Sequence, residues 1–460
     1  MNHITIFVQA NNVLFKSKVF IYCLGVISLL LVIFESNELL LLLLYLFSVS
    51  FGFLLYDKVA RHLFFLSYSL LIIILPFLID SYINVAGQPF IPGGDAEMYY
   101  NRITSIAQGN NESYYGRYKL FLKILSSYYK VILYLGGSIS YYYFFFFSMF
   151  VGANLSPLLY KIGKGFFSEK VLISGCILTC LFPGLIQVAT NSWRESLVYT
   201  PFLLSIYLAI NINRAKNLIL YFLTFMFLAN IRLEIGVISL TFFVLFNFVF
   251  LNKKELDWIS LMSSKLLLLL LLLTVIFFAF QNGLFEYLKF EKSSSLSYQM
   301  GAYTEMSNET TDDNSISNTL RNAGLIGRFL LFFYTLFAPI PPPGFFQRSF
   351  TFYNLFISIG AIFWYFLMPI AVIGMLNNFK KYNLSSFTKS FFISFVLGII
   401  IISLTSIGTQ RHKLYLYPIL FLYAYDYLEV SKSKTKAKLI LKILLFYAIG
   451  LTLYLFWKIN

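Results

Sequence analysis

His62–Tyr82, with the sequence HLFFLSYSLLIIILPFLIDSY, is an apolar run long enough to cross a bilayer as a helix. The first long polar break of the chain follows it and ends in Gly93–Tyr100, GGDAEMYY. Proline and glycine before Asp95 indicate a tight turn, so Asp95 and Glu97 leave that turn just outside a hydrophobic span. The two acids fit a helix N-cap and first turn in a solvated loop, and they equally fit a functional site. A functional role requires other unusual residues to gather on the same side of the membrane.

The whole chain has the composition of a membrane protein. Of its 460 residues, 59% are hydrophobic and only 12% are charged, and the mean hydropathy is +0.75. Repeated long apolar runs with this composition exclude a water-soluble fold and predict an all-α polytopic membrane protein. The formal net charge is +15. No soluble segment interleaves basic with aromatic residues, so nucleic acid is not expected as a partner.

Apolar runs of about 17–25 residues predict about 13 transmembrane helices, within a range of roughly 11–14, in a single integral membrane domain over residues 1–460. The runs lie near 19–34, 38–56, 62–82, 138–160, 171–189, 196–212, 217–231, 235–251, 264–281, 352–376, 389–407, 413–429 and 439–457. A further run, 326–340, leads into the proline-rich sequence APIPPPG at 338–344. That sequence cannot continue a helix, so 326–340 is predicted to be re-entrant or interfacial.

Two long segments are expected on the outer, periplasmic side. The first, 83–137, contains Arg117–Leu135, where basic and aromatic residues mix with leucine and isoleucine. This mixture predicts an amphipathic helix lying on the membrane surface. The second, 282–351, is a large and partly mobile loop whose polar part, 293–323, fits a lid over a membrane-face cleft and a disordered insertion equally well.

The basic residues divide by type between the two sides. With the N-terminus in the cytoplasm, the positive-inside rule places most lysines in the inner connections. Arginine has the opposite distribution, and those expected outside are Arg102, Arg117, Arg194, Arg232, Arg321, Arg328, Arg348 and Arg411. Topogenic charge does not distinguish the two cations, whereas the guanidinium group binds phosphate bidentately. The outer face is therefore predicted to bind a phosphate-bearing ligand.

Five short polar motifs are expected at the outer ends of spans. They are GDAE at 94–97, NSWRE at 191–195, NIRLE at 230–234, FQR at 346–348 and GTQRH at 408–412. The two arginine–glutamate motifs fit local ion pairs or snorkelling to headgroups, and they also fit a shared aqueous site. His412 follows Arg411 at the start of a span, where a structural role and a general-base role are both open.

The order of these features resembles the Wzy-type O-antigen or capsular polysaccharide polymerases and the related O-antigen ligases. The resemblance is carried by Arg194-Glu195 before a span, Arg232 one hairpin later, and GTQRH after the large loop. The GDAE turn resembles the first-loop acidic motif of GT-C glycosyltransferases, although it follows the third span here rather than the first. The resemblance implies a GT-C-like helical bundle in the bacterial inner membrane, with the active site facing the periplasm.

The activity that the resemblance implies is polymerisation of oligosaccharide repeat units from a polyprenyl-diphosphate-linked donor. The residues implied in substrate binding are Arg194, Glu195, Arg232, Glu234, Arg348 and Arg411. The residues implied in catalysis are Asp95, Glu97 and His412. No cofactor is required, but Asp95 and Glu97 are the place for a divalent cation if one is used. The expected partners are the lipid bilayer, a chain-length regulator and a flippase.

Three other functions stay open at this point. A GT-C transferase or an O-antigen ligase would use a similar polyprenyl-linked sugar donor. A lipid-linked oligosaccharide flippase should carry charge within its spans and an internal repeat, and the sequence has neither. A non-catalytic scaffold would not need the arginine asymmetry. We therefore predict that Arg194, Arg232, Arg348 and Arg411 line one cavity, with Asp95 or Glu97 at its mouth.

Overall fold

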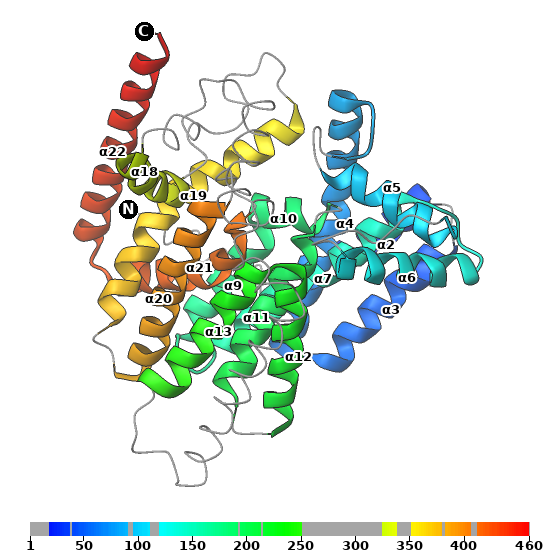
Figure 1. Ribbon diagram of the computed structural model, residues 1–460, viewed down its shortest axis with the longest axis horizontal. Coiled ribbons are helices and arrows are strands. Elements are labelled where there is room, and N and C mark those ends of the chain that lie inside the picture. Colours follow the sequence, from blue (N-terminus) through cyan, green and yellow to red (C-terminus); the bar gives the residue numbers. More distant parts are fainter. Residues whose placement is uncertain are drawn as a thin grey trace, which may run out of the picture.

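The computed structural model describes residues 18–36, 39–90, 95–110, 119–191, 194–212, 215–250, 324–337, 351–379, 382–405 and 412–459. Within these ranges the regular secondary structure is helical and contains no strand, as predicted. The helices α3 to α6 lie on one side of the molecule, and α18 and α22 lie on the opposite side (Figure 1). The helices α9 to α13 occupy the middle, between these two groups.

The first helices show why the chain turns where it does. They are α2 Lys18–Ser36, α3 Leu39–Leu55 and α4 Lys58–Ala86. The Asp57 carboxylate caps α4 by accepting a hydrogen bond from the backbone N–H of Ala60. At the other end Gly87 adopts a left-handed conformation with φ 71° and donates its N–H to the carbonyl of Ile83. A residue without a Cβ takes that conformation at little cost, so α4 ends there.

Two shorter helices follow, α5 Asp95–Ala107 and α6 Lys119–Tyr134. Asp95 and Glu97 lie in the first turn of α5, where acidic groups favour the positive end of the helix dipole. The rings of Tyr99 on α5 and Phe121 on α6 meet edge to face, with centroids 5.0 Å apart. The helix predicted over Arg117–Leu135 is thus present as α6, and its position on a membrane surface stays a prediction.

The middle of the chain forms a series of short helices. They are α7 Tyr141–Ala153, α8 Leu155–Gly163, α9 Glu169–Leu181, α10 Pro183–Ala189, α11 Ser196–Ile210, α12 Ala215–Ile231, α13 Leu233–Val244 and the π-helix η2 Leu245–Phe250. The helices α9 and α10 meet at an angle of 57° beside Pro183. Proline has no backbone N–H and clashes with the preceding turn, so the chain bends there.

The last described helices are α18 Gly324–Phe337, α19 Phe352–Asn378, α20 Tyr382–Thr405, the 3-10 turn η5 Leu414–Leu416, α21 Tyr417–Val430 and α22 Ser433–Ile459. The helices α19 and α21 pack closely at Gly374. A Cβ at this position would collide with the backbone carbonyl of Tyr423, so only glycine fits there. Small residues at such crossings let two helix backbones approach in a membrane protein.

Five described helices are long and apolar enough to cross a membrane, or six if α9 and α10 form one bent span. This fits a helical membrane protein, but the predicted number of about 13 spans is not shown. Part of the difference lies in helix length, since the runs 196–212 and 217–231 became α11 and α12, of 15 and 17 residues. At about 1.5 Å per residue they are shorter than a hydrocarbon core of about 30 Å. The run 264–281 lies outside the described residues.

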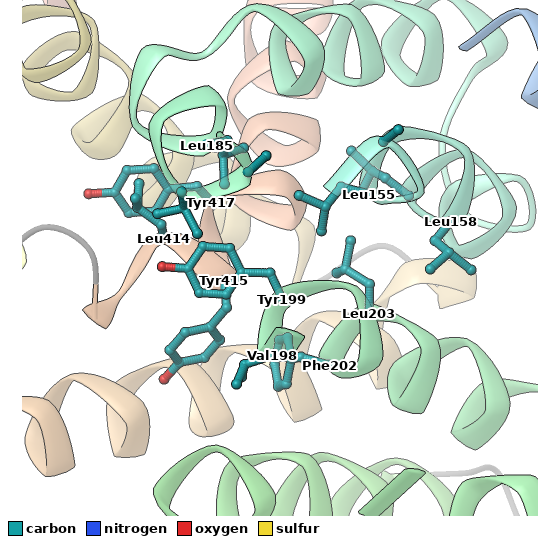
Figure 2. Close-up of a cluster of buried hydrophobic side chains, with 14 of the residues drawn as sticks. Leu155, Leu158, Leu185, Val198, Tyr199, Phe202, Leu203, Leu414, Tyr415 and Tyr417 are labelled. Carbon is teal, nitrogen blue, oxygen red and sulfur yellow. The ribbon is translucent and has the colours of Figure 1, made fainter. Parts of the chain in front are cut away.

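A tightly packed apolar cluster lies beside segments that carry candidate site residues (Figure 2). Tyr415 of η5 packs against α11, where its ring meets Phe202 edge to face at 4.9 Å. Tyr199 on the same helix lies beside it, with ring centroids 6.3 Å apart. These rings are almost fully buried. The packing fixes the turn before α21 against the start of α11, and both segments carry candidate site residues.

Candidate functional site

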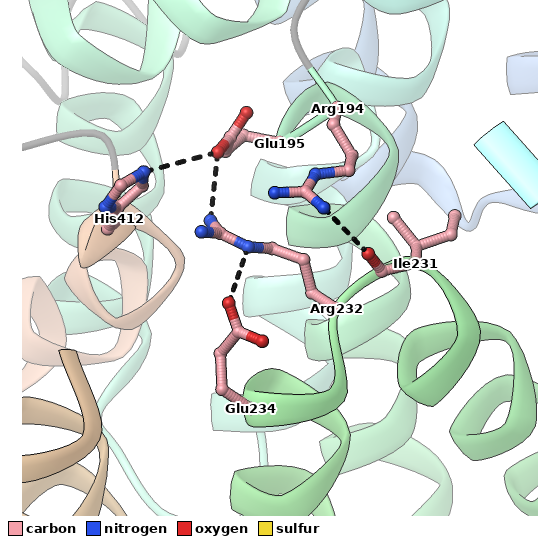
Figure 3. Close-up of polar contacts among 6 residues, drawn as sticks. All are labelled: Arg194, Glu195, Ile231, Arg232, Glu234 and His412. Carbon is pink, nitrogen blue, oxygen red and sulfur yellow. Dashed lines mark hydrogen bonds and ion pairs between the residues drawn. The ribbon is translucent and has the colours of Figure 1, made fainter. Parts of the chain in front are cut away.

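Three breaks between helices bring five of the nine candidate residues together (Figure 3). Arg194 and Glu195 immediately precede α11, and Arg232 stands between α12 and α13. His412 lies in the turn before η5, next to Lys413. The backbone of Arg232 is extended, with φ −148° and ψ 98°, which ends one helix and starts the next. Helix breaks of this kind let polar side chains enter a buried region without leaving the apolar faces of the helices.

Arg232 is the centre of the cluster and is held by two carboxylates. Its Nη1 lies 2.9 Å from Oε1 of Glu195, and its Nε lies 2.8 Å from Oε1 of Glu234. The exposed fractions of the Arg232 and Glu195 side chains are 8% and 5%. Breaking such a buried pair by removing one partner is expected to cost about 3–5 kcal/mol, because the other charge stays buried.

His412 shares the same carboxylate oxygen. Its Nε2 lies 3.7 Å from Oε1 of Glu195, and 14% of its side chain is exposed. This distance is longer than a hydrogen bond, so the contact is an electrostatic one that strengthens when the imidazole is protonated. Glu195 therefore faces two cationic groups, one permanent and one that depends on pH.

Arg194 uses its guanidinium group to join α11 to α12. Its Nη1 donates to the backbone carbonyl of Ile231, the last residue of α12, over 3.4 Å. A cation is favourable at this end of a helix because the last carbonyls carry partial negative charge. The long distance marks a weak hydrogen bond. Arg194 is partly exposed as a residue, whereas Arg232 is buried.

The charges of the cluster nearly cancel. Burial by itself would lower the pKa of Arg232, but Glu195 and then Glu234 offset it and leave that pKa above its ordinary value. The two guanidinium groups are formally balanced by the carboxylates of Glu195 and Glu234. The protonation state of His412 therefore decides whether these five residues carry net positive charge. A cluster of this composition can bind an anion and can also move a proton.

The sequence had suggested local pairing as one explanation of the two arginine–glutamate motifs. Arg232 does contact Glu234, two residues away, but it also reaches Glu195, which is 37 residues away along the chain. The structure thus brings both motifs and His412 to one place. Arg348 and Arg411 lie outside the described residues, so their part in the predicted cavity stays a prediction.

Asp95 and Glu97 lie elsewhere along the chain, in the first turn of α5. Neither is among the residues whose contacts build the cluster in Figure 3. Their position agrees with the interpretation that they stabilise the N-terminal end of a helix. Their predicted place at the mouth of a shared cavity, and their predicted catalytic role, stay predictions.

Lys413 is a buried residue that directly follows the motif GTQRH and was not among the predicted site residues. Its side chain is fully buried, and its Nζ donates to the backbone carbonyl of Thr335 on α18 over 2.5 Å. The sequence marks Lys413 only as one of three consecutive basic residues, Arg411-His412-Lys413, before an apolar segment.

No family model, no curated protein and no solved structure matches the chain. The inference of function therefore rests on the residues of the cluster and on the contacts between them.

Proposed function

We propose that the chain is a membrane glycosyltransferase that polymerises oligosaccharide repeat units from a polyprenyl-diphosphate donor. The observation that carries this proposal is the shared carboxylate of Glu195, which lies 2.9 Å from Arg232 and 3.7 Å from His412. A buried guanidinium group and a partly exposed imidazole beside one acid could supply both needs of the reaction. They are charge stabilisation at a leaving diphosphate and a base for an incoming hydroxyl.

In the proposed reaction His412 accepts the proton of the acceptor sugar hydroxyl. The acceptor oxygen forms a bond to the anomeric carbon of the donor, and the bond from that carbon to the diphosphate oxygen breaks. Both electrons of the broken bond leave with the diphosphate, whose charge Arg194 and Arg232 would stabilise. Glu195 would orient the imidazole and stabilise the imidazolium ion. This gives Glu195 a positioning role, where the resemblance had implied substrate binding.

The diphosphate would enter the cluster by replacing one of its carboxylates. The Glu234 side chain is 29% exposed, whereas that of Glu195 is 5% exposed. Glu234 is therefore the group that can leave Arg232 at the smaller desolvation cost. In this proposal Glu234 occupies the anion site when no donor is bound.

The finer features belong to the same proposal. They are a GT-C-like bundle of about 13 spans, a cytoplasmic N-terminus, a bacterial inner-membrane location and a site open to the periplasm. Arg348 and Arg411 would add positive charge to the anion site. No cofactor is required, and a divalent cation at Asp95 and Glu97 stays open. The expected protein partners remain a chain-length regulator and a flippase.

The test uses purified full-length protein in proteoliposomes with an undecaprenyl-diphosphate-linked oligosaccharide. Mass spectrometry of released glycans reports chain length. Wild-type protein should lengthen the glycan, and His412→Ala should slow transfer at least about 100-fold, the typical contribution of a general base. His62→Ala is the matched control and should keep the wild-type rate. Movement of donor across the bilayer without any transfer would instead identify a flippase.

A further inference from the structure

Lys413 and His412 are neighbours in the chain, but their side chains contact different helices. His412 faces Glu195 beside α11, and Lys413 reaches the far end of α18. The Nζ of Lys413 donates to the carbonyl of Thr335 over 2.5 Å and to the carbonyl of Leu336 over 3.2 Å. The turn at 412–413 is therefore attached to two separate parts of the fold.

The two carbonyls that Lys413 contacts belong to the last turn of α18, which ends at Phe337. The last carbonyls of a helix have no partner within it, and together they carry partial negative charge. The chain continues into Ala338-Pro339, a sequence that cannot extend the helix. A donor from elsewhere in the chain is needed at this helix end, and Lys413 provides it.

A tryptophan completes this attachment. The indole Nε1 of Trp364 on α19 donates to the carbonyl of Leu336 over 3.1 Å, so this carbonyl accepts hydrogen bonds from two residues. The Nζ of Lys413 lies 5.5 Å from the centre of the Trp364 ring, a cation–π distance. The ring stacks on Tyr417 at 3.5 Å, with an angle of 3° between the planes. The end of α18, α19 and the start of α21 thus meet at Lys413.

A merely structural cap would not need a lysine. A fully buried amine is costly to place away from water, and a neutral amide could donate to the same carbonyls if it were close enough. What distinguishes lysine is its length, because four methylene groups bridge from the turn beside His412 to another helix. The cost of burial is therefore best explained by the connection between the two regions.

We propose that Lys413 is a positioning residue that attaches the C-terminal end of α18 to the turn carrying His412. In this way the position of α18 controls the distance between the imidazole and Glu195. The consequence for catalysis rests on the proposed function, in which His412 is the base. The attachment itself does not, because it can be measured without any substrate.

The experiment compares wild-type protein with Lys413→Met and Lys413→Arg, all full length in nanodiscs. Methionine keeps the volume and removes the donors, whereas arginine keeps the donors and the charge. Hydrogen exchange over 331–337 reports the end of α18. The rate at which diethyl pyrocarbonate modifies His412, read from its peptide over a range of pH, reports its surroundings, which include Glu195, Arg232, Arg194 and Glu234. Lys130→Met, at an exposed position on α6, is the matched control.

We expect Lys413→Met to speed exchange at 331–337 at least about tenfold and to shift the pH midpoint of His412 modification. Lys413→Arg should restore both values toward wild type, and Lys130→Met should change neither. Faster exchange with an unchanged His412 profile would show that Lys413 only stabilises α18, which overturns the proposal. An unchanged exchange rate overturns it as well.

A second variant keeps the test decisive if Lys413→Met does not fold. Trp364→Phe removes one donor to Leu336 and leaves Lys413 in place, so it should alter both readouts in the same direction but less. No change in the His412 profile would again overturn the proposal. If wild-type protein transfers no glycan while both readouts respond to Lys413→Met, the proposed function fails and the attachment stands.

Discussion

Two buried cations, Arg232 and Lys413, lie at neighbouring places in the fold and are stabilised in different ways. Arg232 is compensated by the carboxylates of Glu195 and Glu234. Lys413 is compensated by backbone carbonyls at the end of α18. Carboxylates can move or be replaced by another anion, whereas carbonyls are fixed to their helix. The comparison supports the proposals that the first region binds a ligand and that the second attaches a helix.

The largest effect is expected for Arg232→Ala. Loss of the guanidinium group leaves Glu195 and Glu234 without their buried cation. The free energy of unfolding should therefore fall by about 3–5 kcal/mol. Transfer should fall by roughly 100- to 1000-fold, as when one oxyanion-stabilising donor is removed. Thermal unfolding in detergent and the glycan-transfer assay measure the two losses.

The control for this variant is Arg102→Ala on α5, which should leave both quantities near wild type. The double variant Arg232→Met, Glu195→Gln should recover part of the stability, because it also removes one of the two uncompensated charges, the more deeply buried one. Recovery of stability without recovery of transfer would separate the two roles of Arg232. A stable Arg232→Ala protein would contradict the central place given to this residue.

Glu195→Gln should have the next largest effect. It keeps the shape of the side chain but removes the negative charge that faces His412 and Arg232. A nearby negative charge favours the protonated imidazole, so its loss should shift the modification of His412 toward lower pH. Transfer should fall by about 10- to 100-fold, since the base is no longer oriented. An unaltered pH profile of transfer would show that Glu195 does not act through His412.

Of the two regions compared, the sequence predicted residues of the Arg232 cluster but not the buried Lys413. Arg194, Glu195, Arg232, Glu234 and His412 all stand out because charge beside an apolar run is costly. The sequence could not tell that Glu195 reaches Arg232 rather than pairing locally, because contacts between distant segments depend on how α11, α12 and α13 cross. The apolar runs predicted that these segments are helical, but they did not predict how long each helix is. Pro183 in the sequence marks the place of a bend but not its angle of 57°, and the apolar run 196–212 does not show that α11 has only 15 residues.

The burial of Lys413 could not be predicted from the sequence. Lysine at the start of an apolar segment is normally a topogenic or snorkelling residue, so nothing in the sequence marks it as fully buried. Its burial depends on α18, a 14-residue helix far away in the chain. The packing of α18 against α20 and α19 brings the acceptor carbonyls within reach.

Glu234→Gln is expected to have the smallest effect on stability, and it is expected to strengthen ligand binding rather than weaken it. Its side chain is more exposed than that of Glu195, so removing its charge should destabilise the protein by no more than about 1 kcal/mol. If Glu234 occupies the anion site, the neutral amide competes less well for Nε of Arg232, and binding of farnesyl diphosphate should tighten a few-fold. Calorimetry on nanodisc-embedded protein measures this affinity. Glu195→Gln is the matched variant and should change the affinity less, because its buried carboxylate is not the one that the diphosphate replaces. Equal weakening by both variants would mean that the two carboxylates only hold Arg232 in place, and that the diphosphate binds somewhere else.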